Sequence, residues 1–94
     1  MSLTIQVRTH DNLLELLARG ESAAWVVAQD KERSIERVQV VNFVGTQMIE
    51  GLYHRDPDLQ HNGGRLVIKF HDARITNCHV VFDSQNPVRY IETE

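Results

Sequence analysis

The sequence predicts an α+β fold: a mostly antiparallel, strongly curved sheet or half-barrel of about six to seven strands, with one short helix after the first strand. Two observations predict it. Several strand-like segments carry apolar residues on both faces, whereas an antiparallel sheet with one face in water alternates apolar and polar residues. Only one short helix is available to cover them, so the second face must be hidden because the sheet curls or because a partner covers it. The strand-like segments with apolar residues on both faces are 23–28, 38–43 and 66–70.

Length and composition indicate one globular domain over residues 1–94. The chain has 94 residues, of which 41% are hydrophobic and 24% charged. A chain of this size can bury one modest core, and this composition argues against intrinsic disorder.

The charge pattern disfavours nucleic acid and membrane partners. The net charge is −3, with both signs interspersed, whereas duplex-binding domains usually carry a basic patch. A nucleic-acid interface remains an alternative, and it would need a cluster of arginines on one face. The candidates are Arg33, Arg37, Arg65 and Arg74.

Three features predict a cytoplasmic protein without membrane association. The longest apolar run, 23–28, is too short to span a bilayer. The N-terminal residues lack the charged and apolar regions of a secretory signal. The single cysteine, Cys78, cannot form an internal disulfide and agrees with a reducing compartment.

The first two elements are a strand and a short helix. Leu3, Ile5 and Val7 alternate with polar residues, which is the period of a strand with one buried face. From residue 12 to residue 19 the leucine spacing changes to that of one helix face. Asn12 is the predicted N-cap, and Gly20 favours a left-handed C-terminal residue.

The middle of the chain predicts a hairpin. The β-branched density of residues 23–29 and 35–44 favours two paired strands joined by a polar turn at 30–34. A continuous helix over residues 22–37 is the competing interpretation, because residues 31–37 include good helix formers. Gly45 and Thr46 fit a tight turn into a strand at 48–53, in which Gly51 indicates a bulge or a close backbone approach.

The C-terminal half predicts a polar loop at 54–64, another hairpin and an edge strand. Apolar residues occupy even positions in both 66–70 and 78–82, so pairing Ile68 with Cys78 would place them on one face. That register requires a turn at 72–74. Residues 83–87 are a further predicted turn, and residues 88–91 the final edge strand.

Cys78 is the first residue to consider as a catalytic nucleophile, because histidine can activate a thiolate. The adjacent His79 would point to the opposite face of a strand. Cys78 is therefore interpreted as a small core residue.

A small hydrolase or isomerase is the alternative function, with catalytic groups from the loop at 54–61. The candidates are His54, His61, Asp56, Asp58 and His71. Aspartates in such loops usually serve turns, and no histidine spacing matches a zinc motif. We therefore predict no metal site and no cofactor, and we favour a protein that is not an enzyme.

The apolar surplus predicts a non-enzymatic binding or protein-interaction module that self-associates, with a two-fold dimer favoured. A small ligand or a peptide would enter at the dimer cleft or at the barrel mouth. Trp25 lies in a mostly apolar segment and suits either core, interface or pocket. The ligand or interface candidates are Trp25, Val41, Phe43, Tyr53, Val67 and Val81, and Ile75 belongs to the same surplus.

Overall fold

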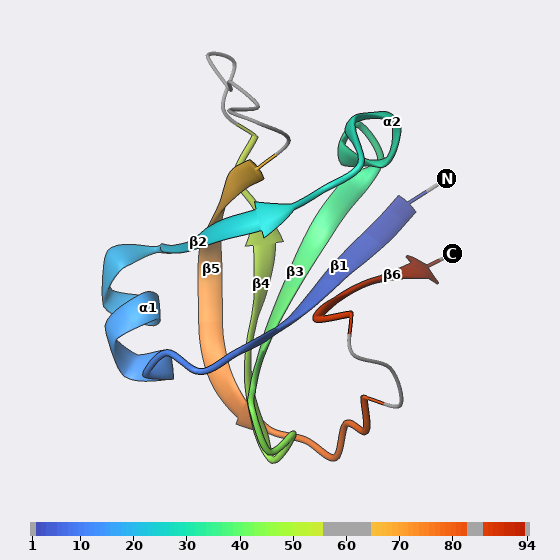
Figure 1. Ribbon diagram of the computed structural model, residues 1–94. Coiled ribbons are helices and arrows are strands. Elements are labelled where there is room, and N and C mark those ends of the chain that lie inside the picture. Colours follow the sequence, from blue (N-terminus) through green and yellow to red (C-terminus); the bar gives the residue numbers. More distant parts are fainter. Residues whose placement is uncertain (1, 56–64, 83–85, 94) are drawn as a thin grey trace.

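The described residues of the protein form one curled sheet of six strands with two short helices (Figure 1). The computed structural model describes residues 2–55, 65–82 and 86–93. The strands follow the spatial order β2-β5-β4-β3-β1-β6, so β2 and β6 are the two edges. The elements are β1 (Ser2–Thr9), α1 (Leu13–Arg19), β2 (Glu21–Val26), α2 (Gln29–Glu32), β3 (Ile35–Asn42), β4 (Gln47–Tyr53), β5 (Arg65–Asn77) and β6 (Val88–Thr93).

The predicted strand-rich, curved architecture is confirmed, but the sheet is mixed rather than purely antiparallel. β1 and β3 run parallel at the centre of the sheet, while the other neighbouring strands pair antiparallel. Parallel neighbours need a long crossover connection. Here α1, β2 and α2 supply that connection between β1 and β3.

The predicted hairpin of 23–29 with 35–44 is wrong. β2 pairs with β5 at one edge of the sheet, whereas β3 lies between β1 and β4. The alternative helix over 22–37 is also wrong, because only Gln29–Glu32 is helical in that range. Strand propensity identified both segments as strands but carries no information about their partners.

The second predicted hairpin is wrong as well. β5 continues from Arg65 to Asn77 without a turn at 72–74. Asp72 has a φ of 50°, and the pairing of β4 with β5 shifts register between Glu50 and Leu52. A bulge therefore bends this strand where a turn was expected.

Residues 78–82 are not a strand paired with β5. They run instead along the turn between β3 and β4, where the Cys78 N–H donates to the Thr46 carbonyl at 2.9 Å and the Val80 N–H to the Gly45 carbonyl at 3.0 Å. A turn forms where it was predicted, but it spans residues 43–46, and the Gly45 N–H closes it by donating to the Asn42 carbonyl at 3.0 Å. Gly45 has a φ of 80°. Of the predicted turn at 83–87, residues 83–85 lie outside the described part of the chain.

The helix α1 forms as its sequence predicts. The Asn12 side-chain oxygen accepts the N–H groups of Leu14 and Glu15, a cap worth about 1 kcal/mol. Gly20 ends the helix in the left-handed conformation at a φ of 70°. Leu13 and Leu16 are buried. The second helix, α2, was not predicted.

The curl buries the inner face of the sheet. On the outer face, a row of hydrogen-bonded polar side chains crosses four strands. The Arg89 guanidinium donates to Gln6, Gln6 donates to Gln39 at 2.8 Å, and Gln39 donates to Glu50 at 3.1 Å. These residues are directly opposite one another on β6, β1, β3 and β4. The second face of the central strands is thus closed mainly by paired polar side chains. The innermost core residues are Ile5, Val7, Leu16, Ile35, Val38, Val40, Ile49, Leu66 and Ile68.

Candidate functional site

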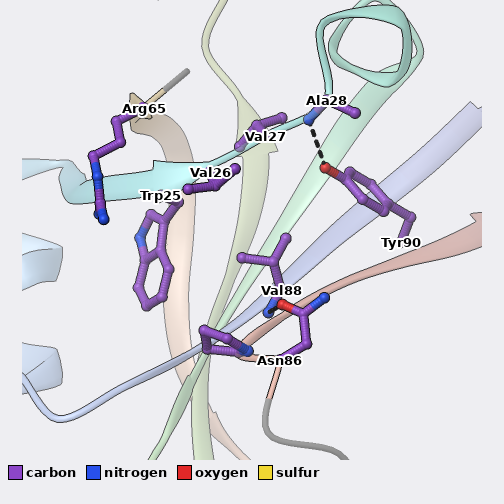
Figure 2. Close-up of a pocket in the computed structure, with 9 residues that line it drawn as sticks. Trp25, Val26, Val27, Ala28, Arg65, Asn86, Val88 and Tyr90 are labelled. Carbon is purple, nitrogen blue, oxygen red and sulfur yellow. Dashed lines mark hydrogen bonds between the residues drawn. The ribbon is translucent and has the colours of Figure 1, made fainter. Parts of the chain in front are cut away.

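The curl brings the two edge strands together around a groove of about 560 Å³ (Figure 2). This volume lies within the range of small-ligand sites, about 300–1,000 Å³. We call it the edge groove. β2 and the residues after it form one wall, and residues 86–90 form the other. The lining residues are Trp25, Val26, Val27, Ala28, Arg65, Asn86, Pro87, Val88 and Tyr90.

The lining of the edge groove is mostly apolar and contains no carboxylate, imidazole or thiol among the described residues. Val26 is 62% exposed, although valine in a strand is usually covered. Val27 and Val88 are buried beneath it. The groove therefore offers a mostly apolar surface, with the Tyr90 hydroxyl and the Arg65 and Asn86 side chains as its polar groups.

Tyr90 bridges the two walls at one end of the groove. Its hydroxyl accepts the main-chain N–H of Ala28 at 3.0 Å, as Figure 2 shows. The Lys31 ammonium of α2 lies 4.6 Å from the centre of the Tyr90 ring, which places a cation at this end.

Trp25 forms the other end of the groove. Its indole N–H donates to the Ser22 hydroxyl at 2.9 Å, which satisfies the polar atom of the ring. The ring also packs against the core. The Ser22 hydrogen bond and the core contacts therefore fix the orientation of the Trp25 ring, and the rest of the ring surface lines the groove.

A second, more polar hollow continues from Trp25. It has a volume of about 410 Å³ and shares Trp25 and Pro87 with the edge groove. The His10 ring stacks on Phe43 with 4.0 Å between centroids, and the Arg8 guanidinium lies 4.7 Å from the Phe43 ring centre. The lining residues are Arg8, Thr9, His10, Asp11, Ala23, Trp25, Phe43 and Pro87.

The predicted ligand or interface residues differ in how exposed they are. Trp25 lines both hollows, and Phe43 and Val81 are exposed, at 49% and 66%. Val67 is half-buried on β5. Val41 is fully buried and Tyr53 is in the core, so neither belongs to a surface open to a partner.

Tyr53 takes part in a structural brace that also contains Glu32 and Arg55. The Tyr53 hydroxyl donates to the buried Glu32 carboxylate at 3.0 Å, and Arg55 forms an ion pair with the same group at 3.1 Å. Arg55 also donates to the carbonyls of Glu32, Arg33 and Ile35. These bonds secure α2 to the end of β4.

The structure brings together two of the predicted catalytic candidates. The rings of His54 and His71 meet edge to face, 6.0 Å apart, and the His71 Nδ1 lies 3.1 Å from the Asp72 carboxylate. All three residues are exposed. Asp56, Asp58 and His61 lie outside the described residues. Within residues 2–55, 65–82 and 86–93, no three His, Cys, Asp or Glu side chains are placed to hold a metal ion.

Cys78 is half-buried, and its thiol donates to the Gly45 carbonyl at 3.4 Å. Burial raises the pKa of the Cys78 thiol, which opposes formation of the thiolate that a nucleophile needs. This agrees with a packing role, although Cys78 lies beside the β3–β4 turn and not in the predicted strand.

Sequence reasoning identified Trp25 but missed the opposite wall of the groove. Residues 88–91 were recognised as an edge strand, which is confirmed by β6. Ala28 and Tyr90, 62 residues apart in the chain, meet because the sheet curls. The sequence did not indicate that the segment 23–29 lies at the other edge, because it was predicted to pair with 35–44.

The chain matches no protein-family model, and no similar curated protein or solved structure was found. In the part of the chain that the structure describes, no helix is long and apolar enough to cross a membrane.

Proposed function

We propose that this protein is a non-enzymatic binding module whose ligand occupies the edge groove. The observation that carries the proposal is an apolar groove of about 560 Å³ between two free sheet edges. Exposed apolar surface of this kind marks binding sites in soluble proteins. The absence of carboxylate, imidazole and thiol groups from its described lining supports binding in preference to catalysis.

An apolar anionic dye, 8-anilinonaphthalene-1-sulfonate, tests this proposal. The dye is expected to bind the folded protein in the edge groove and to change the fluorescence of Trp25, the single tryptophan of the sequence. Val26→Asp is expected to weaken binding by about tenfold or more, because it puts a charge into the apolar wall. Val26 is exposed, so this variant should fold.

Leu14→Asp is the matched control, because Leu14 is 69% exposed but lies on α1 and does not line the groove. Dye affinity for this variant should equal that of the unchanged protein. Failure of the dye to bind, or equal losses in the two variants, would contradict a ligand site in the edge groove.

We also propose that the protein forms a two-fold dimer. The supporting observation is an apolar end patch, defined as Phe43, Val44 and Val81. The Val80 N–H bonded to the Gly45 carbonyl holds residues 78–82 against the turn that carries Phe43 and Val44. Closed two-fold dimers are the commonest oligomers, and exposed apolar patches favour them.

Light scattering tests the dimer. The unchanged protein should have the mass of two chains at micromolar concentration, and Val44→Asp with Val81→Asp should have the mass of one. Leu14→Asp, at an apolar position on α1 that is 69% exposed, should leave the mass unchanged. A mass of one chain for the unchanged protein would contradict the proposed dimer.

A further inference from the structure

The two edges of the sheet run in the same direction. β5 is antiparallel to β2 and β4, β3 is antiparallel to β4, and β1 is parallel to β3 and antiparallel to β6. β2 and β6 therefore both run opposite to β1. A chain inserted between them and running the other way would be antiparallel to both, which is the slightly more stable form of strand pairing.

Side chains occupy main-chain donors at both edges. The Ala28 N–H, just after β2, is held by the Tyr90 hydroxyl at 3.0 Å. On β6, the Pro87 carbonyl accepts from the Arg8 N–H of β1, so the Val88 N–H points away from β1. That N–H is held by the Asn86 side-chain oxygen at 3.1 Å. In each case a side-chain oxygen stands where the carbonyl of a neighbouring strand would lie.

The distance between the edges at Tyr90 leaves room for at most one added strand. The Tyr90 hydroxyl reaches the Ala28 N–H, and a tyrosine side chain with one hydrogen bond spans at most about 9.5 Å, roughly two strand spacings. One strand between two neighbours needs the whole of that distance. Inward side chains of the added strand would enter the apolar groove beside Trp25 and Val88.

The charged groups around the groove favour an acidic segment. Lys31 lies against Tyr90 at one end, and Arg8 lines the hollow that continues from the other end. Arg65 also lines the groove, and Asp11 is the acidic residue of the second hollow. Cations therefore predominate here, although the chain has a net charge of −3.

From these observations we infer that the ligand of the edge groove is an extended, acidic peptide segment of a partner protein. The segment adds as a strand between β2 and β6, antiparallel to both, and closes the half-barrel. Its main-chain carbonyls replace the Tyr90 and Asn86 side-chain oxygens as acceptors at the two edges, and its alternate apolar side chains fill the groove. This inference rests on the proposed binding function and specifies its ligand.

A displayed library of random linear peptides of about ten residues, long enough to cover β6, tests the inference. Selection on the intact protein should enrich peptides that alternate apolar residues and carry acidic ones. A synthetic copy of a selected peptide should displace the dye from the groove. Val26→Asp should weaken its binding by about tenfold or more, while Leu14→Asp should not.

N-methylation of the peptide main chain, one residue at a time, then tests insertion. A strand held on both sides donates alternate N–H groups to opposite neighbours, so methylation at both odd and even central positions should lower affinity about tenfold. Sensitivity at alternate positions only would show pairing with one edge, and insensitivity would show recognition by side chains alone. Either result would contradict insertion of the peptide as a strand between β2 and β6.

The same experiment separates the inference from the function on which it rests. If the dye binds the groove but no peptide is enriched, the peptide inference is overturned and the binding function stands, with a small apolar anion as its ligand. If neither dye nor peptide binds, both proposals fail.

Discussion

Gly51→Ala is expected to lower the free energy of unfolding by about 3 kcal/mol, because the new methyl group would overpack the junction of β4 and β5. A Cβ at residue 51 would lie 2.6 Å from the Ala73 Cβ and 3.0 Å from the His71 carbonyl oxygen. Both contacts lie at the bulge that bends β5. Urea unfolding followed by far-ultraviolet circular dichroism measures the loss.

Ala73→Gly provides the matched second variant. It removes the Cβ nearest to the new methyl group, so it should restore part of the stability lost in Gly51→Ala. The His71 carbonyl contact remains, and full recovery is not expected. Equal losses with and without Ala73→Gly would show that this close approach does not account for the need for glycine.

Arg55→Met is expected to cost about 2–3 kcal/mol of unfolding free energy. The change leaves the buried Glu32 carboxylate without its cation and removes donors from the carbonyls of Arg33 and Ile35. This loss of unfolding free energy is smaller than that for breaking a fully buried ion pair, because the Arg55 side chain is 46% exposed and solvent screens its charge.

Arg74→Met is the control for this second prediction, because Arg74 is an exposed arginine of β5. Its effect should stay within about 0.5 kcal/mol, as for most surface substitutions. Chemical denaturation of both variants provides the comparison. A loss in Arg55→Met no larger than in Arg74→Met would show that the brace contributes little to stability.

Local signals in the sequence predicted the local structure well. Asn12 and Gly20 define the ends of α1, and Gly45 marks the turn between β3 and β4. These signals succeed because caps and turns depend on residues a few positions apart. Gly51 was predicted as a bulge or close approach, and the register shift and the nearby Ala73 confirm it.

Strand pairing was not predictable in the same way. The β-branched density of 23–29 and 35–44 predicted the strands that form as β2 and β3, but main-chain hydrogen bonds are the same for every partner. The pairing of β3 with β1 places Ile35, Val38 and Val40 in the inner core. That arrangement depends on contacts between residues far apart in the chain, which no local pattern encodes.

The candidate site was likewise only partly predictable from the sequence. The sequence by itself determined a strand-rich domain with a capped helix. It also indicated a surplus of apolar residues, of which Val41 is buried whereas Phe43 and Val81 are exposed, and it made Trp25 a candidate pocket residue. Only the tertiary structure decided that β2 and β6 face each other and that Val41 and Tyr53 are interior. The physical reason is that curvature is a property of the whole sheet, accumulated over six strands and fixed by the bulge at Gly51 and Asp72.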